Sequence, residues 1–144
     1  MKILVTGHNG YIGQVMVPLL QQAGHEVVGL DTYFFENCQF DPAPPLEQLR
    51  KDIRDVGPAD LEGFDAVVFL AALSNDALGD LNPDLTFAIN GRATVDCARA
   101  AREAGVRRFV FSSSCSLYGA SGDDVLDEQA AMNPVTPYGQ AKID

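Results

Sequence analysis

The sequence is poor in cysteine and histidine, and both shortages narrow the class of protein. Its three cysteines are widely spaced and form no Cys-x-x-Cys pair, which argues against a disulfide framework and a zinc site. This pattern predicts a reduced, cytoplasmic setting. The two histidines supply too few ligands for most histidine-based metal sites and for a Ser-His-Asp relay. We therefore expect no bound metal.

Positive charge and long apolar runs are also scarce. Lys and Arg number 10 against 20 Asp and Glu, giving a net charge of −10 that disfavours binding to nucleic acid. No apolar run reaches membrane-spanning length, and the first residues are too short a run for a signal peptide, so no membrane partner is expected. An anionic cofactor stays possible, because backbone N–H groups at a helix N-terminus can hold a pyrophosphate locally.

Short apolar runs alternate with helical patterns along the 144 residues, which is typical of βα units around a parallel sheet. We expect an α/β fold, a Rossmann-type doubly wound parallel sheet with helices on both faces. The first helix has apolar positions at Ile12, Val15, Met16, Leu19 and Leu20, and the second begins with Asn82 as its N-cap. The expected strands are 3–5, 26–31, 66–70 and 108–111, with a short edge strand within 46–53, and the expected helices are 11–23, 82–103 and one starting near 137.

A Gly-x-x-Gly-x-x-Gly loop lies between the first strand and the first helix. Gly7 permits a tight turn, Gly10 lets the backbone approach a pyrophosphate, and Gly13 lets the helix pack close to the strand. The helix then directs its free N–H groups at the phosphates, so the loop predicts a dinucleotide cradle. The side chains of His8 and Asn9 are expected at the loop surface. The predicted cofactor-binding positions of the loop are Gly7, Asn9, Gly10, Tyr11, Ile12 and Gly13.

Asp31 ends the second strand about 20 residues after the glycines. A carboxylate there accepts hydrogen bonds from the adenosine ribose hydroxyls and repels a 2′-phosphate, which favours NAD over NADP. No Arg or Lys occurs between Asp31 and Arg50, so a cation to receive the 2′-phosphate is expected to be missing nearby.

Tyr138 and Lys142 are four residues apart near the start of the last helix, so both project from one face. An ammonium nearby favours the phenolate, which equips Tyr138 to exchange a proton with a substrate hydroxyl. Taken alone, such a pair is more typical of a solvated helix face than of a catalytic site. The serines that follow strand 108–111 make the chemical interpretation more specific, because ligands of open α/β sheets bind at the carboxyl ends of strands.

Among these serines, Ser114 is the candidate to hydrogen-bond the oxygen that Tyr138 deprotonates, with Ser116 in reserve. Ser112 and Ser113 are also explained as caps of the strand end. Cys115 is expected to be a small buried residue, because no base is identifiable beside it.

These motifs resemble the extended short-chain dehydrogenase/reductase family, especially its NAD-dependent nucleotide-sugar epimerases and dehydratases of the UDP-glucose 4-epimerase type. The matching stretches are Thr6–Gly13, Asp31, Asp52–Asp55, Leu70–Ala72, Ile89–Gly91, Ser112–Gly119 and Tyr138–Lys142. The resemblance implies Ser114, Tyr138 and Lys142 as catalytic residues, with Lys142 also holding the nicotinamide ribose. It implies NAD as cofactor, bound further by Asp52 and Ile53 beside the adenine and by Leu70, Ala71, Ala72, Asn90, Ser112 and Tyr138. It also implies that Asn90 helps to order the active site.

Two departures from the family pattern refine this expectation. Family dehydratases carry an Asp-Glu pair where Cys115 and Ser116 stand, so their absence argues against the 4,6-dehydratase branch. The family is about twice as long, so residues 1–144 are expected to form an incomplete NAD-binding Rossmann domain, truncated before the last strands and the C-terminal substrate lobe.

The resulting functional hypothesis is an NAD-dependent epimerase-type oxidoreductase that transfers a hydride reversibly between a nucleotide-sugar and tightly bound NAD. The resemblance implies a homodimer. Two alternatives stay open, a non-catalytic truncated NAD-binding module and a nucleotide-sugar ketoreductase or dehydratase of the same family. The 144-residue chain itself is expected to have no sugar-converting activity.

Overall fold

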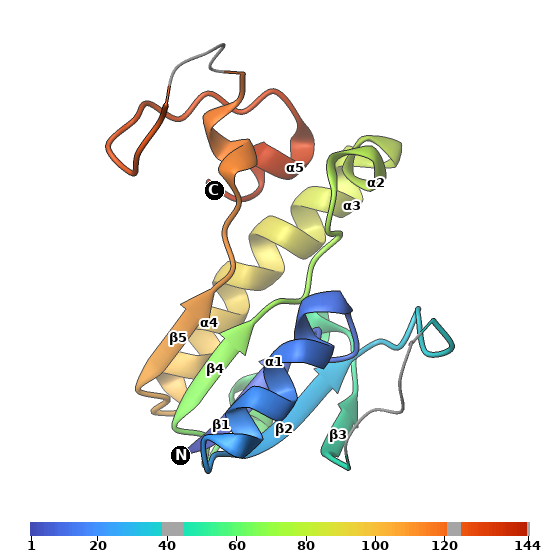
Figure 1. Cartoon of the computed structure of the whole chain (residues 1–144), viewed down its shortest axis with the longest axis vertical. Helices are drawn as coiled ribbons and strands as arrows, with labels where there is room; N and C mark the ends of the chain where they lie inside the picture. The colour runs from blue at the N-terminus through green and yellow to red at the C-terminus, as the bar shows by residue number, and fades with distance from the viewer. Residues whose placement is uncertain (39–44, 121–124, 144) are drawn as a thin grey trace. The chain divides into compact units, whose positions relative to one another are not determined.

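The structure of the chain is a computed structural model that describes residues 1–38, 45–120 and 125–143 (Figure 1). It contains two compact units. The first, which we call the sheet unit, consists of Met1–Ala71 and Val95–Ser112. The second, the helical unit, consists of Ala72–Thr94 and Ser113–Asp144.

The sheet unit is built on a five-stranded parallel sheet with the order β3-β2-β1-β4-β5. The chain moves outward from β1 in one direction and then crosses to the other side of β1 to form β4. This reversal confirms the doubly wound Rossmann-type architecture, and ligands of such sheets bind where the order reverses. The strands are β1 (Lys2–Thr6), β2 (Glu26–Asp31), β3 (Glu47–Arg50), β4 (Ala66–Phe69) and β5 (Arg108–Phe111).

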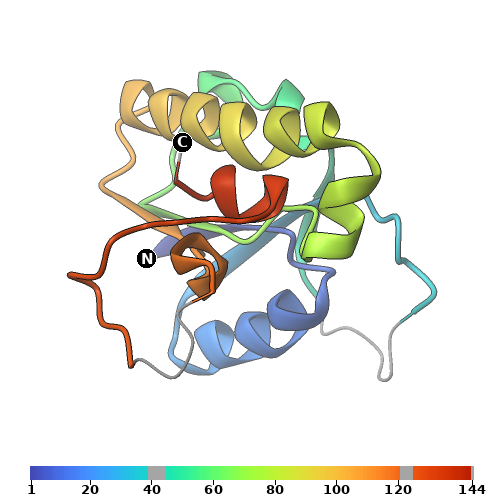
Figure 2. The ribbon, with the colours of Figure 1, turned by 90° about the horizontal axis from the view of Figure 1, so that it is seen from above.

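Helices cover both faces of this sheet, as predicted. Figure 2 shows α1 (Tyr11–Gln22) on one face and α4 (Ala93–Glu103) on the other. Burial drives this arrangement, because β1 and β4 are apolar on both sides and need cover on both. Two short 3₁₀ turns, Ile53–Asp55 and Pro58–Asp60, connect β3 to β4. One core cluster consists of Ile3, Val5, Val17, Val27, Ala66 and Val68, with Met16 and Leu20 packed against it.

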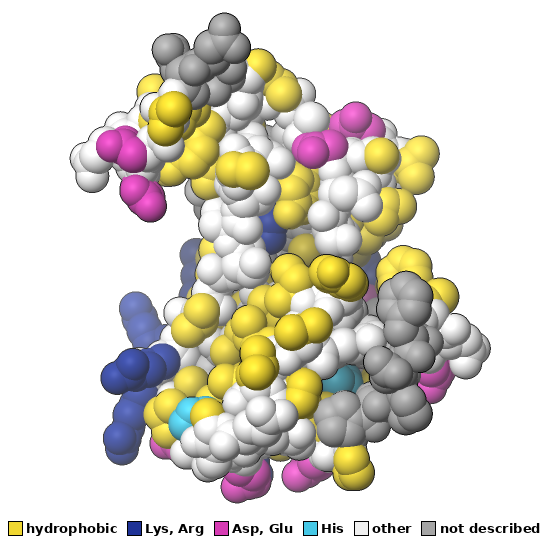
Figure 3. All heavy atoms as spheres, in the orientation of Figure 1, with side chains coloured by type: hydrophobic (Ala, Val, Ile, Leu, Met, Phe, Trp, Pro, Cys, Tyr) yellow, Lys and Arg dark blue, Asp and Glu magenta, His cyan; other side chains and the backbone are white. Residues whose placement is uncertain are grey.

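The apolar positions of α1 divide between two faces of the helix. Met16 and Leu20 pack on the core together with the buried Val17 and Gly13, a spacing of three to four residues that follows one helical face. The other three predicted apolar positions, Ile12, Val15 and Leu19, are more than half exposed. Hydrophobic side chains accordingly gather on the outer surface over α1 in Figure 3.

The helical unit begins with a helix that the sequence did not predict, α2 (Asp76–Leu81). The single helix expected over 82–103 is divided into α3 (Pro83–Thr86), a π-helical segment (Phe87–Arg92) and α4. The N-cap prediction is confirmed, because the Asn82 side chain accepts a hydrogen bond from Leu85 N at 3.0 Å. The unit ends with a 3₁₀ turn (Cys115–Tyr118) and α5 (Pro137–Gln140).

None of the helices in the described part of the chain combines the length and the apolar character needed to cross a membrane.

Candidate cofactor-binding and proton-transfer sites

The glycine loop follows β1 and leaves no room for side chains at two of its three glycines. Gly7 has a φ of +72°, and a Cβ there would lie 2.8 Å from the backbone nitrogen of Ala71. A Cβ at Gly13 would lie 2.4 Å from the carbonyl oxygen of His8. Gly7 N also donates to Leu30 O at 2.8 Å, which fixes the turn against the end of β2. The loop is therefore held between the carboxyl ends of β2 and β4, where a dinucleotide would bind.

The first turn of α1 is open to an anion. Gly10 supplies no side-chain cap, and no acidic residue lies in the first turn. The side chains of Tyr11 and Ile12 are exposed, that of Tyr11 to 85%. The predicted contacts of these two residues with the cofactor would therefore be made by their backbone N–H groups. An uncapped helix N-terminus beside a tight glycine turn fits the pyrophosphate of a dinucleotide.

Asp31 joins the glycine loop to the segment that follows β2. Its Oδ2 accepts a hydrogen bond from Asn9 N at 3.0 Å, and its Oδ1 accepts one from Tyr33 N at 2.9 Å. Each carboxylate oxygen retains acceptor capacity beyond these bonds, so ribose hydroxyls can be received as well. The predicted position of Asp31 at the carboxyl end of β2 is confirmed.

The expectation for the side chains of His8 and Asn9 is wrong, since both residues are buried. Gly29 makes space for the His8 ring on the neighbouring strand, where a Cβ would lie 2.4 Å from the ring. The ring packs edge-on against Tyr33, and His8 Nε2 lies 3.0 Å from the Tyr33 hydroxyl. Burial lowers the pKa of His8, so this histidine is a neutral structural residue at neutral pH.

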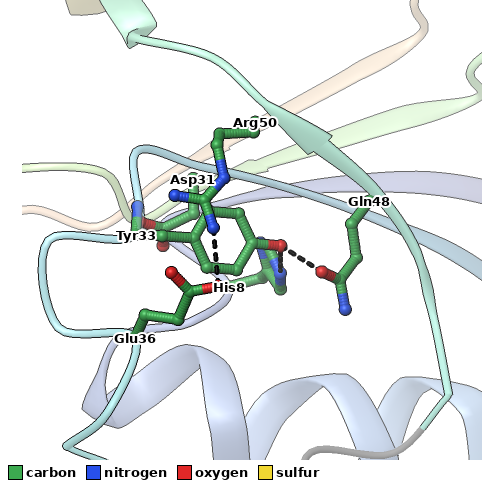
Figure 4. Close-up of polar contacts among 6 residues, drawn as sticks. All are labelled: His8, Asp31, Tyr33, Glu36, Gln48 and Arg50. Atoms are coloured by element: carbon green, nitrogen blue, oxygen red, sulfur yellow. Dashed lines mark hydrogen bonds and ion pairs between the residues drawn. The ribbon is translucent and has the colours of Figure 1, made fainter.

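A cation does lie near Asp31, contrary to the expectation from the sequence. Parallel pairing of β2 with β3 sets Arg50 opposite Asp31 in the register. The Arg50 guanidinium lies over the Tyr33 ring, 4.3 Å from its centroid, and its Nη2 is 2.6 Å from Glu36 Oε1 (Figure 4). Alternation along β3 sets Gln48 and Arg50 on one face, but no local pattern reveals that both meet Tyr33.

The other positions predicted to contact the cofactor in the sheet unit follow β3, β4 and β5. Ala71 is the second residue after β4, and its N–H donates to Thr6 Oγ1 at 3.3 Å. Ser112 N donates to Phe69 O at 3.2 Å, which sets Ser112 beside the end of the same strand. The Asp52 carboxylate binds the Arg54 side chain, which lowers the pKa of Asp52. The Ile53 side chain is in the core, so only its backbone is available to an adenine.

Asn90, in the helical unit, clamps the segment after Ala72. It is 1% exposed, its Oδ1 accepts from Leu73 N at 2.8 Å, and its Nδ2 donates to Leu73 O at 3.0 Å. The π-helical segment carries Asn90, and such segments often occur at functional sites. This geometry is compatible with the ordering role that the family resemblance implies, which stays a prediction.

Tyr138 lies on α5, which starts at Pro137 as predicted. Thr136 caps this helix by accepting from Gly139 N at 3.1 Å, and it also donates to Asp76 Oδ1 of α2. Lys142 Nζ is 5.6 Å from the centroid of the Tyr138 ring, so the two side chains lie on one side of the turn. Burial lowers the pKa of Lys142.

Close packing in the helical unit positions this Tyr138 segment. A Cβ at Gly79 would lie 3.2 Å from Tyr138 Cβ, and one at Gly139 would lie 2.7 Å from Ser116 O. Glycine at both positions therefore lets α5 approach α2 and the 3₁₀ turn closely.

Ser114 is itself a cap, of the 3₁₀ turn Cys115–Tyr118. Its Oγ accepts from Ser116 N at 3.2 Å and lies 3.1 Å from Ser116 Oγ. Ser114 therefore has a structural role as the cap of this turn, although its hydroxyl can still serve a substrate. The expectation that Cys115 is buried is wrong, because this thiol is exposed. The described residues contain no group of three or more His, Cys, Asp or Glu arranged to hold a metal.

Comparison with known proteins agrees with these features. Residues 3–144 match the model of the NAD-dependent epimerase/dehydratase family. The chain is 36% identical to a UDP-glucose 4-epimerase of Streptomyces lividans over 99% of its own length and 44% of that protein.

Solved structures give the same result. The UDP-glucose 4-epimerase of Stenotrophomonas maltophila with bound NAD and formylated UDP-arabinopyranose has a TM-score of 0.88 at 33% identity, with 99% of this chain and 46% of that one covered. MoeE5 in complex with UDP-glucose and NAD has a TM-score of 0.86 at 32% identity, with 99% and 46% covered. The chain thus spans about half the length of the relatives it matches. On this evidence, the chain belongs to the NAD-dependent epimerase/dehydratase family.

Proposed function

We propose that this chain is the NAD-binding and proton-transfer part of a nucleotide-sugar epimerase. The observation that carries the proposal is the glycine loop, in which Gly7 and Gly13 admit no side chain beside an uncapped α1, with Asp31 tied to the same loop. This combination suits a dinucleotide whose pyrophosphate meets the helix N-terminus and whose ribose meets the carboxylate.

NAD fits the residues of the sheet unit. Gly10 and the first N–H groups of α1 would hold the pyrophosphate, and Asp31 would hold the adenosine ribose. Ile53 would offer its backbone to the adenine. When bound, NAD would supply reversible hydride transfer at the sugar carbon and would not be consumed over the cycle.

The helical unit supplies the groups for proton transfer. Oxidation of a sugar hydroxyl releases a proton from its oxygen, and Tyr138 would accept that proton as a phenolate. The positive charge beside Tyr138 would come from Lys142, whose Nζ lies 5.6 Å from the centroid of the Tyr138 ring. Ser114 would hydrogen-bond the same sugar oxygen and keep it oriented. Return of the proton from Tyr138 completes the cycle.

The substrate and assembly are part of the proposal. We propose a nucleotide-sugar as substrate, because the chain belongs to a family that includes such epimerases. From the family resemblance we also propose a homodimer. From the unpaired cysteines we propose a cytoplasmic location.

Two rival functions remain distinct from this one. A non-catalytic NAD-binding module would bind the dinucleotide and convert no sugar. A nucleotide-sugar ketoreductase would consume the reduced cofactor instead of recycling it. Stoichiometric oxidation of NADH in the presence of a keto-sugar nucleotide would indicate the reductase.

The cofactor proposal is tested on the chain itself by calorimetry. NAD should bind more tightly than NADP, Asp31→Ala should narrow that preference, and Gly10→Val should abolish binding of both. Equal or tighter binding of NADP to the unmodified chain would refute the assignment to NAD.

The catalytic proposal needs a chain as long as the relatives. In it, Tyr138→Phe should lower turnover at least ~100-fold while leaving NAD affinity nearly unchanged. Lys142→Ala should reduce both turnover and NAD affinity. Near-normal turnover of the Tyr138→Phe variant would assign the proton transfer to another residue.

A further inference from the structure

The segment after β2 holds a cluster that the proposed function does not use: Tyr33, Glu36 and Arg50, beside Asp31 (Figure 4). We infer that Glu36 is a specificity-determining residue that excludes NADP, because it holds the Arg50 guanidinium in an ion pair and withholds it from a 2′-phosphate. This inference rests on the proposed binding of the dinucleotide with its adenosine ribose at Asp31.

Tyr33 is the fixed point of the cluster. Its φ is +61°, a left-handed conformation that is strained for a residue with a side chain. Several contacts hold it there. Its N–H donates to Asp31 Oδ1, its hydroxyl bonds the buried His8, and the same hydroxyl donates to Gln48. Tyr33 is thereby anchored by the glycine loop, by the end of β2 and by β3.

Arg50 packs on this ring and faces two acids. Its guanidinium lies 4.3 Å from the ring centroid, a distance typical of cation–π contact. Its Nη2 is 2.6 Å from Glu36 Oε1, and the hydrogen bond to Glu36 is the main cause that raises the pKa of Arg50. Asp31 lies opposite Arg50 in the strand register. The guanidinium is therefore near the ribose site but already neutralised.

The neighbouring cation offers no substitute. Lys51 Nζ lies 2.8 Å and 2.7 Å from the two carboxylate oxygens of Asp60, so its charge is engaged away from Asp31. Arg50 is thus the side chain here whose planar donors could form a bidentate contact with a phosphate. Specificity against NADP then has two components, repulsion by Asp31 and retention of Arg50 by Glu36.

Removal of the Glu36 carboxylate should raise the affinity for NADP and leave the affinity for NAD nearly unchanged. In Glu36→Gln the guanidinium is released, and affinity for NADP should increase about fivefold, the upper range for an exposed charge pair. Affinity for NAD should change by less than about twofold, because NAD carries no 2′-phosphate for the released charge to contact. The gain should shrink at high salt, since both partners are exposed.

The experiment is calorimetric titration of NAD and NADP into the 144-residue chain and four variants, each checked for folding by circular dichroism. Glu36→Ala repeats the test in case Glu36→Gln folds poorly. In the double variant Glu36→Gln/Arg50→Met the gain should disappear. Glu47→Gln is the matched control. Glu47 is exposed like Glu36 but lies on β3, so this variant removes one negative charge and should leave the affinities for NAD and NADP unchanged.

Three results would overturn the inference while NAD binding stands: unchanged NADP affinity in both Glu36 variants, a gain that survives the loss of Arg50, or an equal gain in Glu47→Gln. If the unmodified chain bound neither dinucleotide, the proposed function itself would fail, and the inference with it. A gain that needs Arg50 and is absent from Glu47→Gln would establish it.

Discussion

Gly13→Ala is the substitution for which the structure predicts the largest effect from the smallest chemical change. The added Cβ would lie 2.4 Å from His8 O and 2.5 Å from Gly7 O, and both are backbone atoms that no rotamer change can move. Ordinary contact begins at 3.4 Å, so α1 and the loop must separate by about 1 Å. Overpacking of this kind costs about 2 kcal/mol.

The stability effect is measured by urea unfolding followed by circular dichroism. For a chain of this size the urea midpoint should fall by about 1 M, from a slope of about 1.5 kcal/mol per M. Gly57→Ala is the matched control. Gly57 has a φ of −120°, and the nearest atom to a Cβ there is 4.0 Å away, so that variant should be as stable as the unmodified chain or slightly more stable.

The same displacement should weaken NAD binding. The first N–H groups of α1 would move by about the same 1 Å from the pyrophosphate, and hydrogen bonds to charged groups contribute about 1.5–3 kcal/mol. Calorimetry on Gly13→Ala should therefore show a loss of at least about tenfold in NAD affinity. A Gly13→Ala chain with unchanged midpoint and unchanged NAD affinity would refute the close-packed cradle.

Three further predictions concern buried groups. Cys97 is 1% exposed and burial raises its pKa to about 11, so in the native chain it should react with a thiol reagent at pH 8 roughly two orders of magnitude more slowly than an ordinary exposed thiol. Labelling of all three cysteines at equal rates would contradict that burial. Burial lowers the pKa of His8 below 6.5, so as the pH falls the unfolded chain binds a proton at His8 before the folded chain does. The contribution of His8 to the free energy of unfolding should therefore be complete above about pH 6.5 and should be lost as the pH drops toward the folded-state pKa. Urea midpoints at pH 7.5 and 5.5 should show a smaller difference in His8→Gln, and an equal difference would assign the pH dependence elsewhere. Asn90→Ala leaves the N–H and C=O of Leu73 without their side-chain partner and should cost about 2–4 kcal/mol, with faster hydrogen exchange at the Leu73 amide; unchanged exchange there would show that this clamp is not needed.

The sequence by itself was sufficient for the features that local patterns encode. Buried parallel strands are continuous apolar runs, so β1, β2 and β4 could be located within a residue or so. The apolar residues 109–111 located β5 equally well, although that strand is only partly buried. Caps and turns depend on near neighbours, which is why Asn82, the start of α5 and the glycine loop were predictable. Because the end of β2 could be predicted, the position of Asp31 at that end could be predicted as well.

Only the tertiary structure decided which groups these elements bring together. All five predicted apolar positions of α1 have the same character in the sequence. Only the face that α1 turns to the sheet decides that Met16 and Leu20 pack on the core while Ile12, Val15 and Leu19 are exposed. The buried state of His8 depends on the missing side chain of Gly29, a residue 21 positions away that is adjacent only across the sheet.

Arg50 illustrates the same limit at the candidate site. Counting along the chain separates it from Asp31 by 19 positions, whereas the parallel pairing of β2 and β3 makes the two residues neighbours. Neither the left-handed backbone of Tyr33 nor the position of Arg50 over its ring has a local signal. The Tyr33 hydroxyl contacts His8 and Gln48, and Arg50 contacts Tyr33 and Glu36, so these contacts join segments that are far apart in the sequence. Motifs in the sequence therefore predicted a dinucleotide site at the glycine loop and Asp31, and long-range packing decided which charges lie near Asp31.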